Sequence, residues 1–230
     1  MVATEVWIAR VDSDLGEVNR HWLDDTERAR LNAFVAEAEY RRRLTAWCLR
    51  RHVMSSLCPS VSTHAWRFDY PSDGKPRLSS PFDLFGIEHN LSHAGQYVSC
   101  IVSGYACGVD VELLRDGISG LTDALTPEEL DDVRRDSRPD ERFLRYWTIK
   151  EAVLKMFGVG LACPLRAVRV RLASDGRAVD VEVPSRLSLS LRGGLVVDSW
   201  SLPGNHRLAT ACAIPIGTAS PVLREWRGGS

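Results

Sequence analysis

The stretch "WTIKEAVLKMFGVGL" (147–161) reads as an amphipathic helix that a glycine loop ends. With the residues before it, this stretch predicts a helix from about Asp140 to Phe157 that stops at Gly158. A second stretch, "EAEYRRRLTAWCLRRHVMSSL" (37–57), has no Gly or Pro and repeats apolar residues at helical spacing. The chain therefore carries two long helices, and each should pack an apolar face against another layer.

Shorter segments around the two helices read as strands. They are separated by Gly, Pro and Asp turns, and they span residues 4–12, 65–70, 87–93, 96–104, 106–113, 167–172, 178–183, 195–202 and 207–214. A further helix begins at "TPEEL", where Thr126 is the N-cap, Pro127 fits the first turn and Glu129 completes a capping box.

Each half of the chain thus offers one long helix and several strands. This pattern favours the α+β class, with two similar α/β halves related by a pseudo-twofold, each a small antiparallel sheet packed against a long helix. We expect the halves to comprise residues 1–105 and 106–230, with the join near Gly104 to Gly108.

The composition is that of an ordinary globular chain. Hydrophobic residues make up 44% and the net charge is −1, so no global basic field points to nucleic acid or an anionic membrane. No apolar run reaches the roughly 18 residues of a spanning helix and no leader is visible, so we expect a cytoplasmic protein. The six cysteines lack CxxC or zinc-type spacing and are expected to be reduced core residues.

The 147–161 stretch also carries charge in an unusual place. Trp147, Glu151 and Lys155 stand at i, i+4 and i+8, a row that drifts only slightly around the helix axis. An exposed Glu–Lys pair would explain two of these residues, but a solvated row rarely includes a tryptophan. The alternative is a cleft wall that carries a metal ligand or base beside a phosphate-binding lysine.

The strand-like segment "GVDVE" (108–112) pairs two carboxylates. Residues two apart on a strand share a face, so Asp110 and Glu112 project together while Val109 and Val111 enter the opposite, buried side. Two neighbouring carboxylates repel, and a hard divalent cation such as Mg²⁺ is the usual relief. Two solvated acids on a half-exposed strand remain the plainer interpretation of this segment alone.

Three other features have both structural and functional interpretations. In "NLSH", Ser92 and His93 are adjacent on a strand and point to opposite faces, so they make a poor nucleophilic pair. "GKP", which ends at Pro76, is by itself usually a turn. Arg42 continues the apolar stripe of the 37–57 helix and should point toward the protein body or a cleft edge.

Together these motifs resemble one known family. "GVDVE", "WTIKEAVLKMFGVGL", "GKP" and "HNLSHA" stand in the order and spacing of 4′-phosphopantetheinyl transferases, and the chain resembles the Sfp type of that family over nearly its whole length. The resemblance implies transfer of the phosphopantetheine arm of coenzyme A to a serine of an apo carrier protein, with release of 3′,5′-ADP. It also implies a Mg²⁺-dependent monomer with coenzyme A at the junction of the halves, serving polyketide, nonribosomal peptide or fatty-acid carriers.

The resemblance also assigns roles to residues. Asp110, Glu112 and Glu151 are implied to hold Mg²⁺, with Glu151 helping to deprotonate the incoming serine and Lys155 neutralising charge on the pyrophosphate. The implied coenzyme A contacts are Lys155, Arg42, Lys75, Pro76, Ser92 and His93, with Arg28 and Arg30 aligning more loosely. His89 stands where the family usually has Phe, which affects local packing.

Two other functions compete with the transferase. A metal-dependent phosphohydrolase would use the same three carboxylates, but it leaves "GKP", "NLSH" and the glycine-ended helix unexplained. A non-catalytic carrier-protein binding module would keep the fold, yet Asp110, Glu112, Glu151 and Lys155 are all intact. Modification of apo carriers by coenzyme A and Mg²⁺ discriminates between the three.

Overall fold

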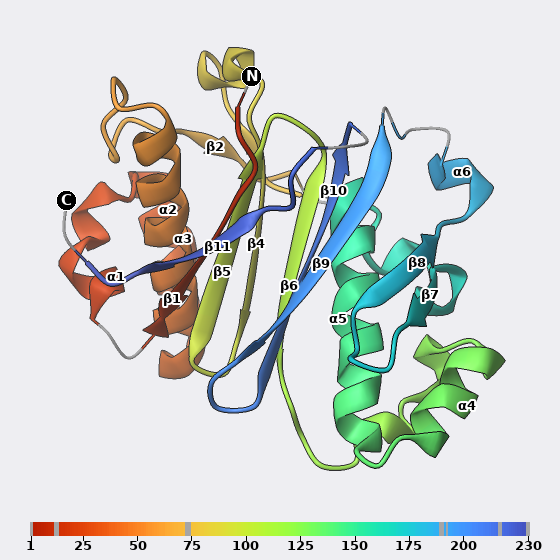
Figure 1. The fold of residues 1–230 in the computed structure, drawn as a ribbon. Coiled ribbons are helices and arrows are strands. Elements are labelled where there is room, and N and C mark those ends of the chain that lie inside the picture. The colour runs from red at the N-terminus through yellow and green to blue at the C-terminus, as the bar shows by residue number, and fades with distance from the viewer. Residues whose placement is uncertain are drawn as a thin grey trace. The chain divides into compact units, whose positions relative to one another are not determined.

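A computed structural model describes residues 2–11, 14–71, 75–188, 191, 193–215 and 218–228 (Figure 1). The chain forms two compact units, one of Met1–Tyr105 with Pro221–Ser230 and one of Ala106–Ser220. Both mix helices with small sheets, which confirms the α+β class. The last ten residues, expected in the second half, belong to the first unit because their strand pairs there. Gly74 of the "GKP" motif lies outside the described residues.

The first unit is a four-stranded sheet against a long helix. The sheet order is β11-β1-β5-β4, with β1 Glu5–Arg10, β4 Glu88–Ala94, β5 Tyr97–Ser103 and β11 Val222–Trp226. β11 runs parallel to β1, and the other pairs are antiparallel. Helix α3 (Glu37–Leu57) packs on this sheet, and the smaller elements are α1 Leu15–Val18, α2 Asp25–Asn32, β2 Phe68–Asp69 and β3 Arg77–Leu78.

The second unit repeats this plan. Its antiparallel sheet has the order β6-β10-β9, with β6 Cys107–Leu113, β9 Gly194–Leu202 and β10 His206–Ile214. Helix α5 (Pro139–Phe157) packs against β6 and β10. The remaining elements are α4 Pro127–Arg135, α6 Ser185–Ser188 and a two-stranded sheet of β7 Arg169–Leu172 and β8 Ala178–Glu182.

The helix ends follow the signals in the sequence. Gly158 closes α5 with φ 68°, a left-handed conformation in which a side chain would be strained. At the start of α4, Glu129 N donates to Thr126 Oγ1 at 3.3 Å and Thr126 N donates to Glu129 Oε2 at 2.7 Å, so the predicted capping box is confirmed. The predicted bounds of α3 are also confirmed, and those of α5 differ by one residue.

The predictions for the other strands and helices and for the cysteines are confirmed in part. The 65–70 strand shortens to β2, while α1, α2 and β11 have no counterpart in the sequence prediction. All six cysteines are free and five are buried, as predicted, whereas Cys58 is only half-buried. Among the described helices, none is long and apolar enough to cross a membrane.

Candidate functional site

A glycine brings strand β6 unusually close to helix α5. Gly108, Asp110 and Glu112 share one face of β6, while Val109 and Val111 are fully buried on the other. A Cβ at position 108 would overlap the carbonyl oxygen of Ala152 and the amide nitrogen of Met156. Only glycine therefore permits this approach, which lets the acidic face of β6 meet the side chains of α5.

Four side chains meet at this contact, and we call them the acid–lysine cluster: Asp110 and Glu112 of β6 with Glu151 and Lys155 of α5. Lys155 Nζ donates to Asp110 Oδ1 at 2.6 Å, and Asp110 is only 2% exposed. Burial, reinforced by Asp110 and Glu151 and opposed by Lys155, raises the pKa of Glu112 to about 7. Burial and Asp110 likewise raise the pKa of Glu151. The predicted catalytic and metal residues thus lie within electrostatic reach of one another.

The donor chemistry of the cluster fits a hard divalent cation. Three carboxylates with a single lysine leave excess negative charge, and the pKa values of Glu112 and Glu151 are raised first by burial and then by the neighbouring carboxylates. Within the described ranges, no three His, Cys, Asp or Glu side chains already form a metal-binding group. Metal ligation by Asp110, Glu112 and Glu151 therefore stays a prediction, supported by donor type and charge.

Trp147 anchors the row that the sequence singled out. Its ring lies 5.9 Å from that of Phe143 and packs partly buried against the hydrophobic core of the second unit. One turn after Trp147, Glu151 is half-buried, and after one further turn Lys155 donates to Asp110. The row therefore runs from the hydrophobic core of the second unit to the acid–lysine cluster. The interpretation of Glu151 and Lys155 as a solvated ion pair does not hold.

The first unit carries an aromatic pocket of about 250 Å³. Its walls include Trp47 and Tyr70, whose rings lie 5.9 Å apart, and the guanidinium of Arg30 stacks 4.5 Å from the Tyr70 ring centre. Arg43 and His93 also line it. Flat aromatic walls with cationic groups suit a planar base that carries phosphate.

A cation cluster of Arg42, Arg43 and His93 gathers next to this pocket. Arg43 Nε donates to Glu39 Oε1 at 2.6 Å, and Arg42 Nη2 donates to Glu39 Oε2 at 3.2 Å. His93 Nε2 lies 3.7 Å from Glu39 Oε1. The predicted pair of Arg42 and His93 is thus brought together, with Arg43 as a third member.

Other predicted coenzyme A contacts are placed differently. Pro76 and Arg30 line the aromatic pocket. Lys75 Nζ donates to Glu88 at 3.2 Å, and Ser92 is buried with its carbonyl accepting from Ser99 Oγ. Arg28 donates to the Leu23 carbonyl and to Asp25 and does not line the pocket, so its contact with coenzyme A stays a prediction.

Four residues of the first-unit site were missed from the sequence. They are Glu39, Arg43, Trp47 and Tyr70. The first three stand at i, i+4 and i+8 on α3, the same spacing that drew attention to the α5 row. That signal could have found three of them, whereas Tyr70 reaches the pocket only through the fold.

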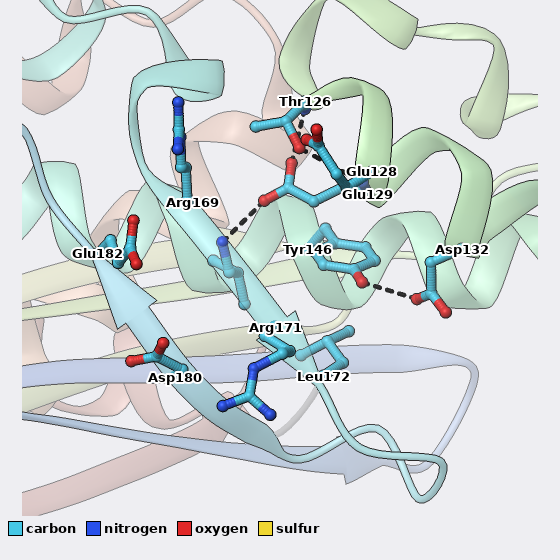
Figure 2. A pocket seen from close by; sticks show the side chains of 11 residues that line it. Thr126, Glu128, Glu129, Asp132, Tyr146, Arg169, Arg171, Leu172, Asp180 and Glu182 are labelled. Atoms are coloured by element: carbon cyan, nitrogen blue, oxygen red, sulfur yellow. Dashed lines mark hydrogen bonds between the residues drawn. The ribbon is translucent and has the colours of Figure 1, made fainter.

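A second pocket, of about 390 Å³, lies in the second unit between α4, α5, β7 and β8 (Figure 2). Its walls are tied by internal bonds: Tyr146 donates to Asp132 at 2.6 Å, and Val170 N donates to Glu129 at 2.8 Å. No member of the acid–lysine cluster lines it. These two bonds tie α4 to α5 and to β7.

Comparison with known proteins gives a consistent likeness. The family model of the 4′-phosphopantetheinyl transferase superfamily matches residues 106–200. The 4′-phosphopantetheinyl transferase HetI of Nostoc sp. is 36% identical over 177 residues, covering 70% of this chain and 72% of that protein. The 4′-phosphopantetheinyl transferase Sfp of Bacillus subtilis is 24% identical over 197 residues, covering 84% of each chain.

Among solved structures, a crystal structure of holo-[acyl-carrier-protein] synthase from Neisseria meningitidis is 22% identical. It covers 47% of this chain and 96% of its own, with a TM-score of 0.39. The family match contains the whole acid–lysine cluster.

Proposed function

Because this chain belongs to the 4′-phosphopantetheinyl transferase superfamily, we propose that it transfers the 4′-phosphopantetheine arm of coenzyme A to a serine of an apo acyl- or peptidyl-carrier protein. The observation that carries the proposal is the acid–lysine cluster on the facing sides of β6 and α5. The transfer releases 3′,5′-ADP, and the chain acts as a monomer. The carriers are those of polyketide, peptide or fatty-acid synthesis.

The reaction requires a nucleophile that the partner supplies. The serine hydroxyl oxygen of the carrier forms a bond to the phosphorus next to pantetheine, and the bridging bond from that phosphorus to the 3′,5′-ADP oxygen breaks. Glu151, the carboxylate on the α5 wall, accepts the serine proton. Burial and Asp110 raise the pKa of Glu151, so it holds a proton more readily than an ordinary carboxylate does.

The remaining cluster residues control charge. Mg²⁺, when held by Asp110, Glu112 and Glu151, supplies charge neutralisation at the pyrophosphate. Lys155 stands beside Asp110, where its ammonium reaches the same region and balances the charge that grows on the departing 3′,5′-ADP. Asp110 keeps that ammonium oriented through its 2.6 Å hydrogen bond.

The first unit is proposed to hold the nucleotide end of coenzyme A. Arg42 and His93 bind the 3′-phosphate, and Arg43 joins them because it bridges the cation cluster and the aromatic pocket. The pocket itself, walled by Trp47 and Tyr70, receives the adenine. Lys75, Pro76 and Ser92 complete this end of the site, and residues 106–220 supply the metal and catalytic groups.

The test is intact-mass analysis of a broad panel of apo carriers incubated with the enzyme, coenzyme A and Mg²⁺. Each modified carrier should gain one phosphopantetheine group on its serine. EDTA and Asp110→Asn should each prevent the gain, and Asp123→Asn, which removes a carboxylate outside the cluster, should not. An unmodified panel, or full activity in EDTA, would overturn the proposal.

A further inference from the structure

The carboxylate of Glu39 occupies the centre of the cation cluster. Arg43 and Arg42 hold its two oxygens at 2.6 and 3.2 Å, and His93 approaches one of them from β4 at 3.7 Å. The Glu39 side chain is 24% exposed, so the group is partly shielded from water. One carboxylate thus faces two arginines and a histidine from two different elements.

The electrostatics keep this carboxylate ionised. Partial burial raises the pKa of Glu39, but His93, Arg43 and Arg42 more than offset that effect and hold it below its ordinary value. An anion is therefore present between the two guanidinium groups and the His93 ring at neutral pH, before any phosphate arrives.

The same cations also face the space where a ligand is proposed to lie. Arg43 and His93 line the aromatic pocket, whereas Glu39 does not. A phosphate entering from the pocket would meet Arg43 and His93, which already contact the Glu39 carboxylate. Two anions cannot share these partners without repelling each other.

We propose that Glu39 is a specificity-determining residue, an internal anion that competes with the 3′-phosphate of coenzyme A for Arg42, Arg43 and His93. The inference rests on the proposed function of this pocket. Glu39 occupies the cation cluster and prevents weakly charged anions from binding there. A phosphate dianion carries more charge and displaces the Glu39 carboxylate. When the Glu39 carboxylate binds these groups again, it assists release of the 3′,5′-ADP product.

A positioning role for Glu39 makes the opposite prediction. Ion pairs at i, i+3 and i, i+4 on an exposed helix contribute only a few tenths of a kcal/mol, so they hold the arginines weakly. If Glu39 nevertheless oriented the guanidinium groups for the phosphate, removing its charge would weaken binding. If it competes, removing its charge strengthens binding.

The experiment is calorimetric titration of the full chain with 3′,5′-ADP and with 5′-AMP, which lacks the 3′-phosphate. Glu39→Gln should bind 3′,5′-ADP about fivefold tighter than the parent protein, the effect of roughly one removed surface repulsion. Its affinity for 5′-AMP should stay within about twofold, because that ligand does not compete with Glu39. Glu37→Gln is the matched control, since it removes an exposed carboxylate from the same helix away from the cluster.

The outcomes separate the two proposals. Weaker or unchanged 3′,5′-ADP binding by Glu39→Gln would overturn the competition, and so would an equal gain with 5′-AMP or with Glu37→Gln. If neither the parent protein nor Glu39→Gln binds 3′,5′-ADP better than 5′-AMP, then the assignment of the 3′-phosphate to this cluster is wrong as well. A parent preference for 3′,5′-ADP without a gain in Glu39→Gln leaves that assignment intact and removes only the role of Glu39.

Discussion

At the scale of single residues, the α5 row carries two proposed catalytic roles, which mutation can separate. Lys155→Ala should lower kcat more than it raises the KM for coenzyme A, because the charge it balances grows as the leaving group departs. Lys155→Arg should recover part of the activity, since the guanidinium keeps the charge but is planar and bulkier. Glu151→Gln should reduce kcat most, because it removes both the proposed base and a proposed metal ligand.

Steady-state transfer to one purified apo carrier, measured across coenzyme A concentrations, gives these values. A change confined to KM in Lys155→Ala would show that the lysine binds the ground state. In that case its assignment to the transition state is wrong.

His89 gives the first unit a pH-dependent stability. Burial, with the charges of Arg50 and Lys75, holds the pKa of His89 well below its ordinary value of 6.5. The folded state therefore keeps the ring neutral, and its stability is full above pH 6.5. As the pH falls below 6.5 the unfolded chain takes up the proton first, so stability should fall by up to about 1.4 kcal/mol per pH unit from this group.

Replacement by the usual family residue tests this. His89→Phe should flatten the decline of the urea midpoint between pH 7 and pH 5, because Phe cannot titrate and can still pack against Phe68, whose ring lies 5.5 Å away. His64→Phe, at an exposed site, serves as the control. An unchanged slope in His89→Phe would contradict the prediction.

At the scale of elements, the approach of β6 to α5 depends on Gly108. Gly108→Ala places a methyl group against the α5 backbone, which cannot rotate away as a side chain could, so the helix must shift. We expect a loss of about 3 kcal/mol or more in unfolding free energy and a larger loss of transfer activity, because Lys155 and Glu151 move with α5. Gly120→Ala is the control, since its Cβ would meet nothing within 4 Å. Urea unfolding followed by circular dichroism measures both variants, and equal stability would contradict the assigned close approach.

The same elements show what a sequence can predict. Both long helices were readable because apolar spacing is a local signal, and α5 also has a terminal glycine. The face shared by Asp110 and Glu112 was readable for the same reason, since strand alternation is local. Strand β11 could not be predicted in this way. Its five residues pair in parallel with β1, more than two hundred positions earlier, and nothing in their local sequence indicates that partner. The meeting of Glu39 with His93 also depends on how α3 packs on β4.

At the scale of the whole molecule, the two units share a topology. In each sheet the first strand pairs with the second strand of a later hairpin, giving β1-β5-β4 and β6-β10-β9. In each unit a capping-box glutamate is buried against cations of the long helix. Glu27 contacts Arg50 and Arg51, and Glu129 contacts Lys150 at 2.5 Å. These correspondences are what duplication of one ancestral unit would produce, while the pseudo-twofold relation between the units stays a prediction.

The units differ at the end of the chain, and that difference is testable. β11 adds a parallel strand to the first unit, pairing Glu5 with Val222 through to Ala9 with Trp226. Trp226 is buried, and its ring stacks on His52 at 4.9 Å and on Trp22 at 5.9 Å. Ending the chain after Ser220 removes this ring and leaves β1 as an open edge, which should cost about 3–5 kcal/mol in the first unit.

Hydrogen exchange measured by mass spectrometry locates that loss. Amides of β1 and α3 should exchange faster in the chain that ends after Ser220, whereas amides of α5 and β10 should keep their protection, because none of their strand partners is removed. A chain that ends after Trp226 keeps β11 and should behave like the parent. Faster exchange to the same extent in α5 and β10 would contradict the assignment of the last strand to the first unit alone, since it would mean that β11 stabilises both units together.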